Sequence, residues 1–238
     1  MNSELELKLR EAVACFWSSR ETQAQKQGAI SGIRDAGARA AVTGGSQMDG
    51  FVALVRDLLE ESGVDKPVIY CERCVELPGW FRPEKKWDLL VVVDGRLIAA
   101  IEFKSQVGSF GNNYNNRSEE AIGNAIDVWT AYREGRFGTV RPWLGYLFLL
   151  EEAPGSIKPV RVKQPFFEVD PIFLDASYKQ RYEILCRRLI LERLYDAACF
   201  ITAAADPVSP INEPAPDLSF MAFANAIRAR ATGLLSAE

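Results

Sequence analysis

Histidine is absent from the 238-residue sequence, and this absence removes several classes of catalytic site at once. Ser-His-Asp and Cys-His nucleophile systems, histidine-ligated zinc sites and histidine-metal nucleases all need an imidazole. Carboxylates and lysine are then the side chains left to carry chemistry. The net charge of −4 argues against a uniformly basic coat for nucleic acid, although a local basic groove remains compatible with it.

Long apolar runs and an export signal are lacking as well. The longest apolar runs, residues 89–93 and 143–150, fall far short of the roughly 20 residues that a membrane-spanning helix needs. The first dozen residues are charged, and the five cysteines are an odd number scattered along the chain, which favours reduced thiols over disulfides. We therefore expect a soluble, cytoplasmic protein.

The composition, with 48% apolar and 25% charged residues, is that of an ordinary globular protein. Helical apolar spacing near residues 5–16 and 51–59, followed by strand-like apolar runs, predicts an α/β fold. A chain of this length is within reach of one large domain, so we expect a single domain over residues 1–238.

A β-hairpin is predicted where the apolar runs 87–93 and 97–103 flank Asp94-Gly95. Turn residues, capping residues and apolar runs then define the segments that follow. We expect a polar loop over residues 105–117 and then a helix from the capping box of Asn116 and Glu119 to about Tyr132. A buried strand over 143–150 and a long basic loop over 152–171 should follow. A further helix is expected from Ser177 to about residue 200.

The candidate site is Asp88 with Glu102 and Lys104, the D…E-x-K arrangement of metal-dependent nucleases. The bare E-x-K motif is weak, because it occurs three times, starting at residues 6, 84 and 102. Only the third copy follows an apolar strand. Strand alternation places Glu102 and Lys104 on one face of that strand and the residue between them on the other.

Asp88 shares that face only in certain registers of the hairpin. A strict two-residue Asp-Gly turn places Asp88 opposite Ile101, on the wrong face. A three-residue loop with Gly95 as a left-handed bulge places Asp88 opposite Ala100, beside Glu102. We predict this second register, or an equivalent bulge, because bulges are frequent next to active sites.

In that geometry Asp88, Glu102 and the Phe103 carbonyl are expected to ligate Mg²⁺, which prefers oxygen ligands. The ion would polarise a scissile phosphate and acidify a bound water, and Lys104 would orient that water or stabilise charge on phosphorus. At this point a structural ion pair remains an equal alternative. Charged residues on a buried strand are costly unless they pair with each other or hold a metal.

Longer strings carry a more specific signal than E-x-K. They are residues 87–92 (WDLLVV), 102–108 (EFKSQVG) and 109–117 (SFGNNYNNR), with further stretches at 119–123, 129–135, 141–151 and 213–218. Together they resemble the XhoI family of type II restriction endonucleases, over most of the chain. Two departures stand out: Trp87 replaces the proline of the superfamily's name, and the loop at 108–109 lacks a family proline, which leaves the site preference open.

The resemblance implies a PD-(D/E)xK fold, which is an α/β fold with a mixed central sheet flanked by helices. It places the catalytic core at about residues 46–150 and Asp88, Glu102 and Lys104 at the catalytic positions. It implies a homodimeric, Mg²⁺-dependent enzyme that cuts double-stranded DNA at CTCGAG and leaves 5′ overhangs and 5′-phosphates. A palindrome suits a two-fold dimer, because each subunit reads one half-site and cuts one strand. A cognate DNA methyltransferase is the expected functional counterpart.

Candidate DNA contacts lie beside the catalytic strand and in the basic loop. Gln and Asn suit adenine and Arg suits guanine, although the same residue types also form turns. The candidates for base contacts are Gln106, Asn112, Asn113, Asn115, Asn116 and Arg117. The candidates for phosphate contacts are Lys158, Arg161 and Lys163. Asp49 or Glu60 is a candidate for a further carboxylate near the metal.

Other functions remain open on the sequence alone. A repair or junction nuclease of the same fold would cut with little dependence on DNA sequence. A catalytically silent DNA-binding protein would have no use for two acids facing a phosphate. A structural interaction protein held by an internal ion pair would show no response to Mg²⁺.

Overall fold

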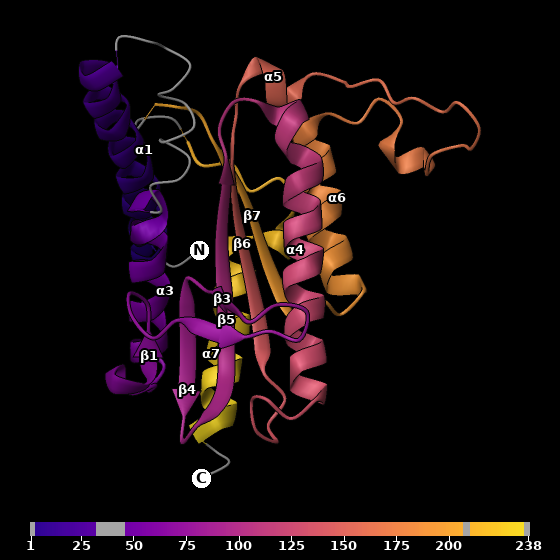
Figure 1. Cartoon of the computed structure of the whole chain (residues 1–238). Coiled ribbons are helices and arrows are strands. Elements are labelled where there is room, and N and C mark those ends of the chain that lie inside the picture. The colour runs from indigo at the N-terminus through magenta and orange to yellow at the C-terminus, as the bar shows by residue number, and fades with distance from the viewer. Residues whose placement is uncertain (1–2, 32–45, 207–209, 236–238) are drawn as a thin grey trace.

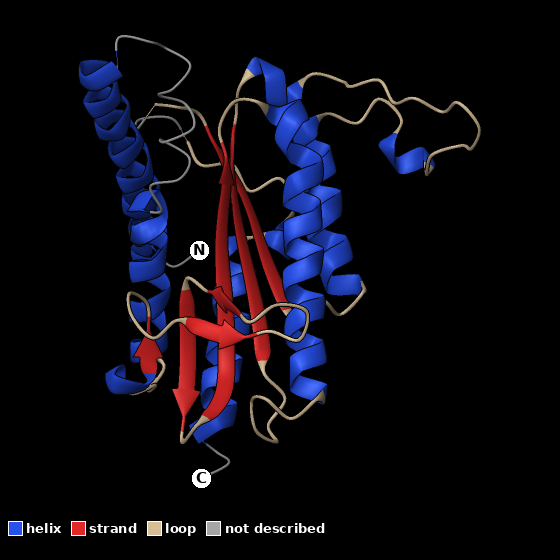
Figure 2. Cartoon of the chain, viewed as in Figure 1, coloured by secondary structure: helices blue, strands red, loops and turns tan. Residues whose placement is uncertain are grey.

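Five strands of the computed structural model form one mixed sheet between two layers of helices (Figures 1 and 2). The structure describes residues 3–31, 46–206 and 210–235. In spatial order the strands are β1 (Ile69–Tyr70), β4 (Leu89–Val93), β5 (Arg96–Gln106), β6 (Trp143–Glu151) and β7 (Ala197–Ala203). The pairs β1/β4 and β4/β5 are antiparallel, whereas β5, β6 and β7 run parallel. The predicted mixed sheet flanked by helices is confirmed.

Each face of the sheet has its own helices (Figure 1). The helices α1 (Ser3–Ser31), α3 (Asp49–Glu61) and α7 (Phe220–Leu235) pack on one face, and α4 (Phe110–Arg133) and α6 (Tyr178–Leu191) pack on the other. Helix α4 links β5 to β6 and α6 links β6 to β7, so both crossovers of the parallel strands lie on the same face. Within the described ranges, no helix is long and apolar enough to cross a bilayer.

The strands contribute alternate side chains to two apolar cores. On β5, Ile101 and Phe103 belong to the core under α1, α3 and α7, whereas Ala100 belongs to the core under α4 and α6. From Ala100 onward, the even-numbered residues of β5 therefore face α4 and α6. Glu102 and Lys104 fall on this second face, as the strand period predicted, and the site is built there.

Shorter elements complete the described chain. The strands β2 (Glu76–Pro78) and β3 (Glu84–Lys86) form a separate antiparallel pair. Short helices are η1 (Ser46–Met48), η2 (Lys66–Val68), α5 (Pro154–Ile157), η3 (Pro171–Phe173) and η4 (Pro216–Leu218). The expected basic loop contains α5, but residues 158–170 form no helix or strand and project beyond α4 and α6 (Figure 1).

Helix α4 begins earlier than its capping signal predicted. Instead of a polar loop up to residue 117, helix starts at Phe110, after Ser109 in the left-handed conformation with φ of 43°. Two aromatic side chains fix the first turns on α6. The Phe110 ring lies 6.3 Å from that of Tyr178, and the Tyr114 ring lies 5.2 Å from that of Tyr182. This packing outweighs the weak helix preference of the asparagines between them.

Strand β7 was missed, because the expected helix from Ser177 to about residue 200 is two elements. Ser177 caps α6 as predicted, but the helix ends at Leu191 and the chain reverses with Arg193 at φ of 56°. Residues 197–203 are all buried between the helix layers as the edge strand beside β6. A short, fully apolar run has no periodicity that distinguishes a buried strand from a buried helix.

Replacing Gly145 by alanine is expected to destabilise the sheet. A Cβ atom at this position of β6 would lie 2.6 Å from an atom of the Trp143 ring and 3.2 Å from the Phe223 ring. We expect G145A to lower the free energy of unfolding by about 1–3 kcal/mol, as overpacking does in other cores.

The matched control is Gly123 on α4, where an added Cβ meets no atom within 4 Å. In a helix interior G123A is expected to stabilise the protein by about 0.5–1 kcal/mol. Urea unfolding of the two variants checks both signs, and equal stability of G145A and wild type would contradict the close packing at β6.

Candidate active site

A β-bulge at Ile98 sets the register that forms the site. The turn at the end of the hairpin is the strict two-residue one, with Val93 paired to Arg96, so the predicted three-residue loop is wrong. The register then shifts by one, since Val92 pairs with Leu97 but Val91 pairs with Ala99. The extra residue on β5 is the equivalent bulge that the sequence allowed as the alternative.

The shifted register brings Asp88 to the polar face of β5. Leu89 pairs with Ile101, so Asp88 lies level with Glu102 and not opposite Ala100 as predicted. The Phe103 backbone N–H donates a 2.8 Å hydrogen bond to Asp88 Oδ2. Glu102 is 1% exposed, and its Oε1 atom pairs with the ammonium group of Lys104. The structure therefore places the three predicted catalytic residues together, while their roles stay a prediction.

A second lysine, Lys85 on β3, also reaches Glu102 and was missed by the sequence reasoning. Its Nζ atom lies 2.5 Å from Glu102 Oε2 and 4.1 Å from the centre of the Trp87 ring. The sequence signal was the short charged run at residues 84–86, which reads as an exposed turn. The pairing of β2 with β3 in a hairpin gives Lys85 its direction.

The turn between β2 and β3 is fixed to α4 by a buried carboxylate. Asp127 Oδ1 accepts the backbone N–H groups of Trp80 at 2.8 Å and Phe81 at 2.9 Å, and Oδ2 accepts Arg82 Nε at 2.7 Å. Burial alone would raise the pKa of Asp127, but these donors hold the pKa below its usual value. The clamp positions the hairpin that delivers Lys85.

The charged groups in the site shift one another's pKa values. Burial, reinforced by Glu102, raises the pKa of Asp88 to about 6. Burial would also raise the pKa of Glu102, but Lys104 and Lys85 hold it below its usual value. The two lysines differ: burial lowers the pKa of Lys85, whereas Glu102 and Asp88 outweigh burial and raise the pKa of Lys104.

The donor set fits a hard divalent cation. Asp88 and Glu102 supply carboxylate oxygens, and ammonium groups already occupy both oxygens of Glu102 as stand-in cations. The N–H and C=O of one strand residue point to the same side, so the Phe103 carbonyl also faces Asp88. The described residues contain no cluster of three or more acidic or cysteine side chains. Two carboxylates with a carbonyl suit Mg²⁺, which keeps several waters.

Neither Asp49 nor Glu60 lies on this face. Both are on α3, which packs on the core that holds Ile101 and Phe103, on the opposite side of the sheet from Glu102. Glu60 lies 3.6 Å from Arg56, and burial together with the charge of Glu72 raises the pKa of Asp49. The structure therefore does not bring either residue to the candidate metal ligands.

The candidate base-contacting residues lie on β5 and on α4 rather than in a loop. Gln106 is buried and donates to the Gly108 carbonyl at 2.5 Å. Asn113 and Arg117 are half-buried. The positive charge of Arg117 acts to lower the pKa of Lys104. The fully exposed candidates on the first turns of α4 are Asn112, Asn115 and Asn116.

The three phosphate candidates Lys158, Arg161 and Lys163 are exposed on the projecting segment between α5 and η3. The Arg181 side chain of α6 ties the base of this segment to the body, since its Nη2 atom donates to the Val160 carbonyl at 2.8 Å. Among the described residues, no hydrogen bond or ion pair joins Lys158, Arg161 or Lys163 to Asp88, Glu102 or Lys104. The structure thus presents a basic arm without bringing it to the carboxylates.

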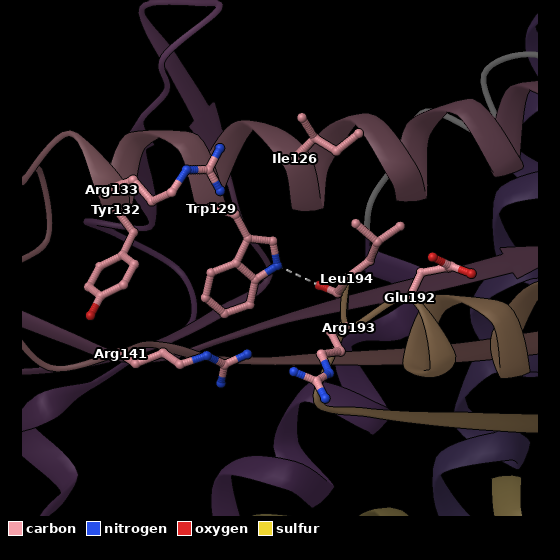
Figure 3. Close-up of a pocket in the computed structure, with 8 residues that line it drawn as sticks. All are labelled: Ile126, Trp129, Tyr132, Arg133, Arg141, Glu192, Arg193 and Leu194. Carbon is pink, nitrogen blue, oxygen red and sulfur yellow. Dashed lines mark hydrogen bonds between the residues drawn. The ribbon is translucent and has the colours of Figure 1, made fainter.

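A separate pocket of about 380 Å³ lies at the C-terminal end of α4 (Figure 3). The Arg141 guanidinium lies 4.4 Å from the centre of the Trp129 ring and pairs with Asp196 at 2.6 Å. The Trp129 indole N–H donates to the Leu194 carbonyl at 2.9 Å. These contacts join α4 to the starts of β6 and β7, and none of the predicted site residues lines the pocket.

Known proteins resemble the chain along most of its length. The profile of the family described as restriction endonuclease XhoI matches residues 26–211. The chain is 48% identical over 199 residues to the type II restriction enzyme BstVI of Geobacillus stearothermophilus, covering 80% of this chain and 89% of that enzyme. It is 54% identical over 157 residues to the type II restriction enzyme AbrI of Azospirillum brasilense, and the match covers 65% of this chain and 70% of that enzyme.

A third relative is the type II restriction enzyme XhoI of Xanthomonas vasicola, which is 44% identical over 191 residues and covers 77% of this chain and 74% of that enzyme. The family resemblance drawn from the sequence strings is thereby confirmed. No solved structure matches the chain.

The raised pKa of Asp88 predicts how metal-free stability depends on pH. The unfolded carboxyl ionises near 3.8 and the folded one at about 6, so ionised Asp88 opposes folding above pH 6. This penalty fades as pH falls from about 6 toward 4. In EDTA, D88N is expected to be more stable than wild type at pH 8 by on the order of 2 kcal/mol, with the difference shrinking at lower pH.

Thermal unfolding in EDTA between pH 8 and pH 5 measures this difference. D65N is the control, because it removes an exposed carboxylate that lies outside the site. A stability advantage of D88N that grows toward pH 5 would contradict the assignment.

Proposed function

The chain belongs to the XhoI family of restriction endonucleases, and on this premise we propose that it cuts double-stranded DNA at CTCGAG with Mg²⁺ as its cofactor. It is a type II restriction endonuclease and acts on DNA. The proposal adds the recognition sequence, the identity of the metal, and products with 5′ overhangs and 5′-phosphates. One observation carries it: Asp88, Glu102 and Lys104 meet on one face of β5.

Chemistry at this site needs only carboxylates and lysine. Asp88, Glu102 and the Phe103 carbonyl would hold the metal. When bound, the ion supplies Lewis acidity to the scissile phosphate and lowers the pKa of an attacking water. Lys104 donates hydrogen bonds to that water or to the phosphoryl oxygens, where its charge stabilises negative charge on phosphorus. Glu102 keeps the Lys104 ammonium at this position through their ion pair.

The DNA contacts in this proposal come from two elements. The exposed asparagines of α4, with Arg117, lie directly after the catalytic strand and would read base edges. Lys158, Arg161 and Lys163 on the projecting arm would contact phosphates. A palindromic site implies a two-fold homodimer with one catalytic centre for each strand, and a partner methyltransferase would protect the host DNA.

Plasmid cleavage tests the proposal as a whole. Purified protein is incubated with plasmids that contain or lack CTCGAG, in Mg²⁺ and in EDTA, and the ends of any fragments are sequenced. Cleavage that requires both the metal and the palindrome supports the proposal. Mg²⁺-dependent cleavage at another sequence would refute the recognition site and keep the catalytic site, and no cleavage of any plasmid would refute the activity.

Single substitutions separate the roles of the three central residues. We expect Glu102→Gln and Asp88→Asn to abolish cleavage while DNA binding in Ca²⁺ is kept or tightened, because each removes negative charge near a phosphate. Lys104→Ala should slow single-turnover cleavage about 10²–10³-fold with little change in affinity. Full cleavage by E102Q or D88N would remove the metal-site assignment, and a pure affinity defect in K104A would make Lys104 a phosphate anchor.

Substitution of Lys158 tests whether the projecting arm contacts phosphates. K158A is expected to weaken binding equally on all DNA sequences and to reduce the slope of log affinity against log salt by about one, because one phosphate contact is lost. Fluorescence anisotropy at several salt concentrations measures both effects. The exposed Lys66 beside β1 provides a control variant, K66A, that should bind as wild type does. A changed sequence preference in K158A would contradict a phosphate contact.

A further inference from the structure

Both oxygens of the Glu102 carboxylate are occupied by ammonium groups. Lys104 pairs with Oε1, and Lys85 Nζ lies 2.5 Å from Oε2. The side chains of Glu102 and Lys85 are only 2% and 12% exposed, so water screens their attraction weakly. A divalent cation that binds Glu102 must therefore displace an ammonium group or share an oxygen with it.

The site is electrically balanced without a metal. Two carboxylates, Asp88 and Glu102, face two ammonium groups, Lys85 and Lys104, and their charges sum to zero. The nearby Arg117 is paired with Glu120 at 2.6 Å and adds no net charge. A divalent ion alone would leave the site with an excess of two positive charges. A DNA phosphodiester carries one negative charge and offsets half of this excess.

The two lysines are not equivalent in this balance. Lys104 follows Glu102 on the same strand, so the backbone of β5 keeps the two side chains together. Lys85 comes from another strand, and its ammonium group contacts the Trp87 ring as well as Glu102. A long lysine stem allows the ammonium group to turn from a carboxylate to a phosphate without movement of the clamped hairpin.

We propose that Lys85 is a second active-site lysine that competes with the divalent ion for Glu102 and makes tight metal binding depend on DNA. A phosphate in the site draws the Lys85 ammonium away from Oε2 and frees that oxygen for the metal. Because such coupling is reciprocal, the metal also strengthens DNA binding by the same factor. This role rests on the proposed nuclease function and assigns it a residue outside the D…E-x-K motif.

Calcium binding, which needs no turnover, tests the competition directly. Isothermal titration measures Ca²⁺ affinity of wild type, K85M and K86M, with and without a duplex that contains CTCGAG. Lys86 is the exposed neighbour on β3 and serves as the matched control. Without DNA, K85M is expected to bind Ca²⁺ at least about tenfold more tightly than wild type, because one repelling charge is gone. The duplex should tighten Ca²⁺ binding strongly in wild type and K86M but little in K85M.

Unchanged or weaker Ca²⁺ affinity in DNA-free K85M would overturn the proposal. If K85M does not fold, K85Q replaces it, since glutamine keeps a donor for Glu102 without the charge, and the same tightening is expected. Wild type supplies a test that needs no variant: equal Ca²⁺ affinity with and without bound duplex would also overturn the coupling. Absence of any duplex binding would instead refute the proposed function, while the DNA-free comparison would still decide whether Lys85 competes for Glu102.

Discussion

Glu102 carries a negative charge inside the sheet, and the rest of the site is arranged around the cost of burying it. An isolated carboxylate at 1% exposure would take up a proton rather than stay ionised. Two ammonium groups keep it charged, one from the same strand and one from β3. Since the turn of that hairpin is held by Asp127 of α4, the charge on β5 depends on a contact made 25 residues further along the chain.

The side chains of β5 point alternately into an apolar core and into the candidate site. Ile101 and Phe103 point into a core with no charged member, whereas Glu102 and Lys104 point toward α4 and α6. The bulge at Ile98 completes this separation, because without it the two-residue turn would direct Asp88 into the apolar side. A single inserted residue thus decides whether the second carboxylate meets the first. The nearby Asp-Gly turn, which was the visible signal, only closes the hairpin.

The sequence predicted the sheet, the shared face of Glu102 and Lys104, and the need for a bulge. These features follow from local periodicity and from the cost of burying charge. Sequence reasoning missed the position of the bulge, because Ile98 does not adopt the positive φ that a glycine in the sequence would have marked. It also missed strand β7 and the early start of α4, since the apolar run at 197–203 and the rings of Phe110 and Tyr114 gain their structure from partners far along the chain. Lys85 was missed for the same reason.

The two interpretations of the charged strand, a structural ion pair and a metal site, turn out to share the same contacts. The ion pairs of Glu102 hold its oxygens in the positions that a cation would need, so the pairs prepare the site rather than argue against it. Both interpretations therefore predict the same ion pairs in the metal-free protein. Family membership favours the proposed metal site, because restriction endonucleases generally need a divalent metal to act on DNA. A site whose own charges balance would accept a cation and a phosphate together more readily than either alone.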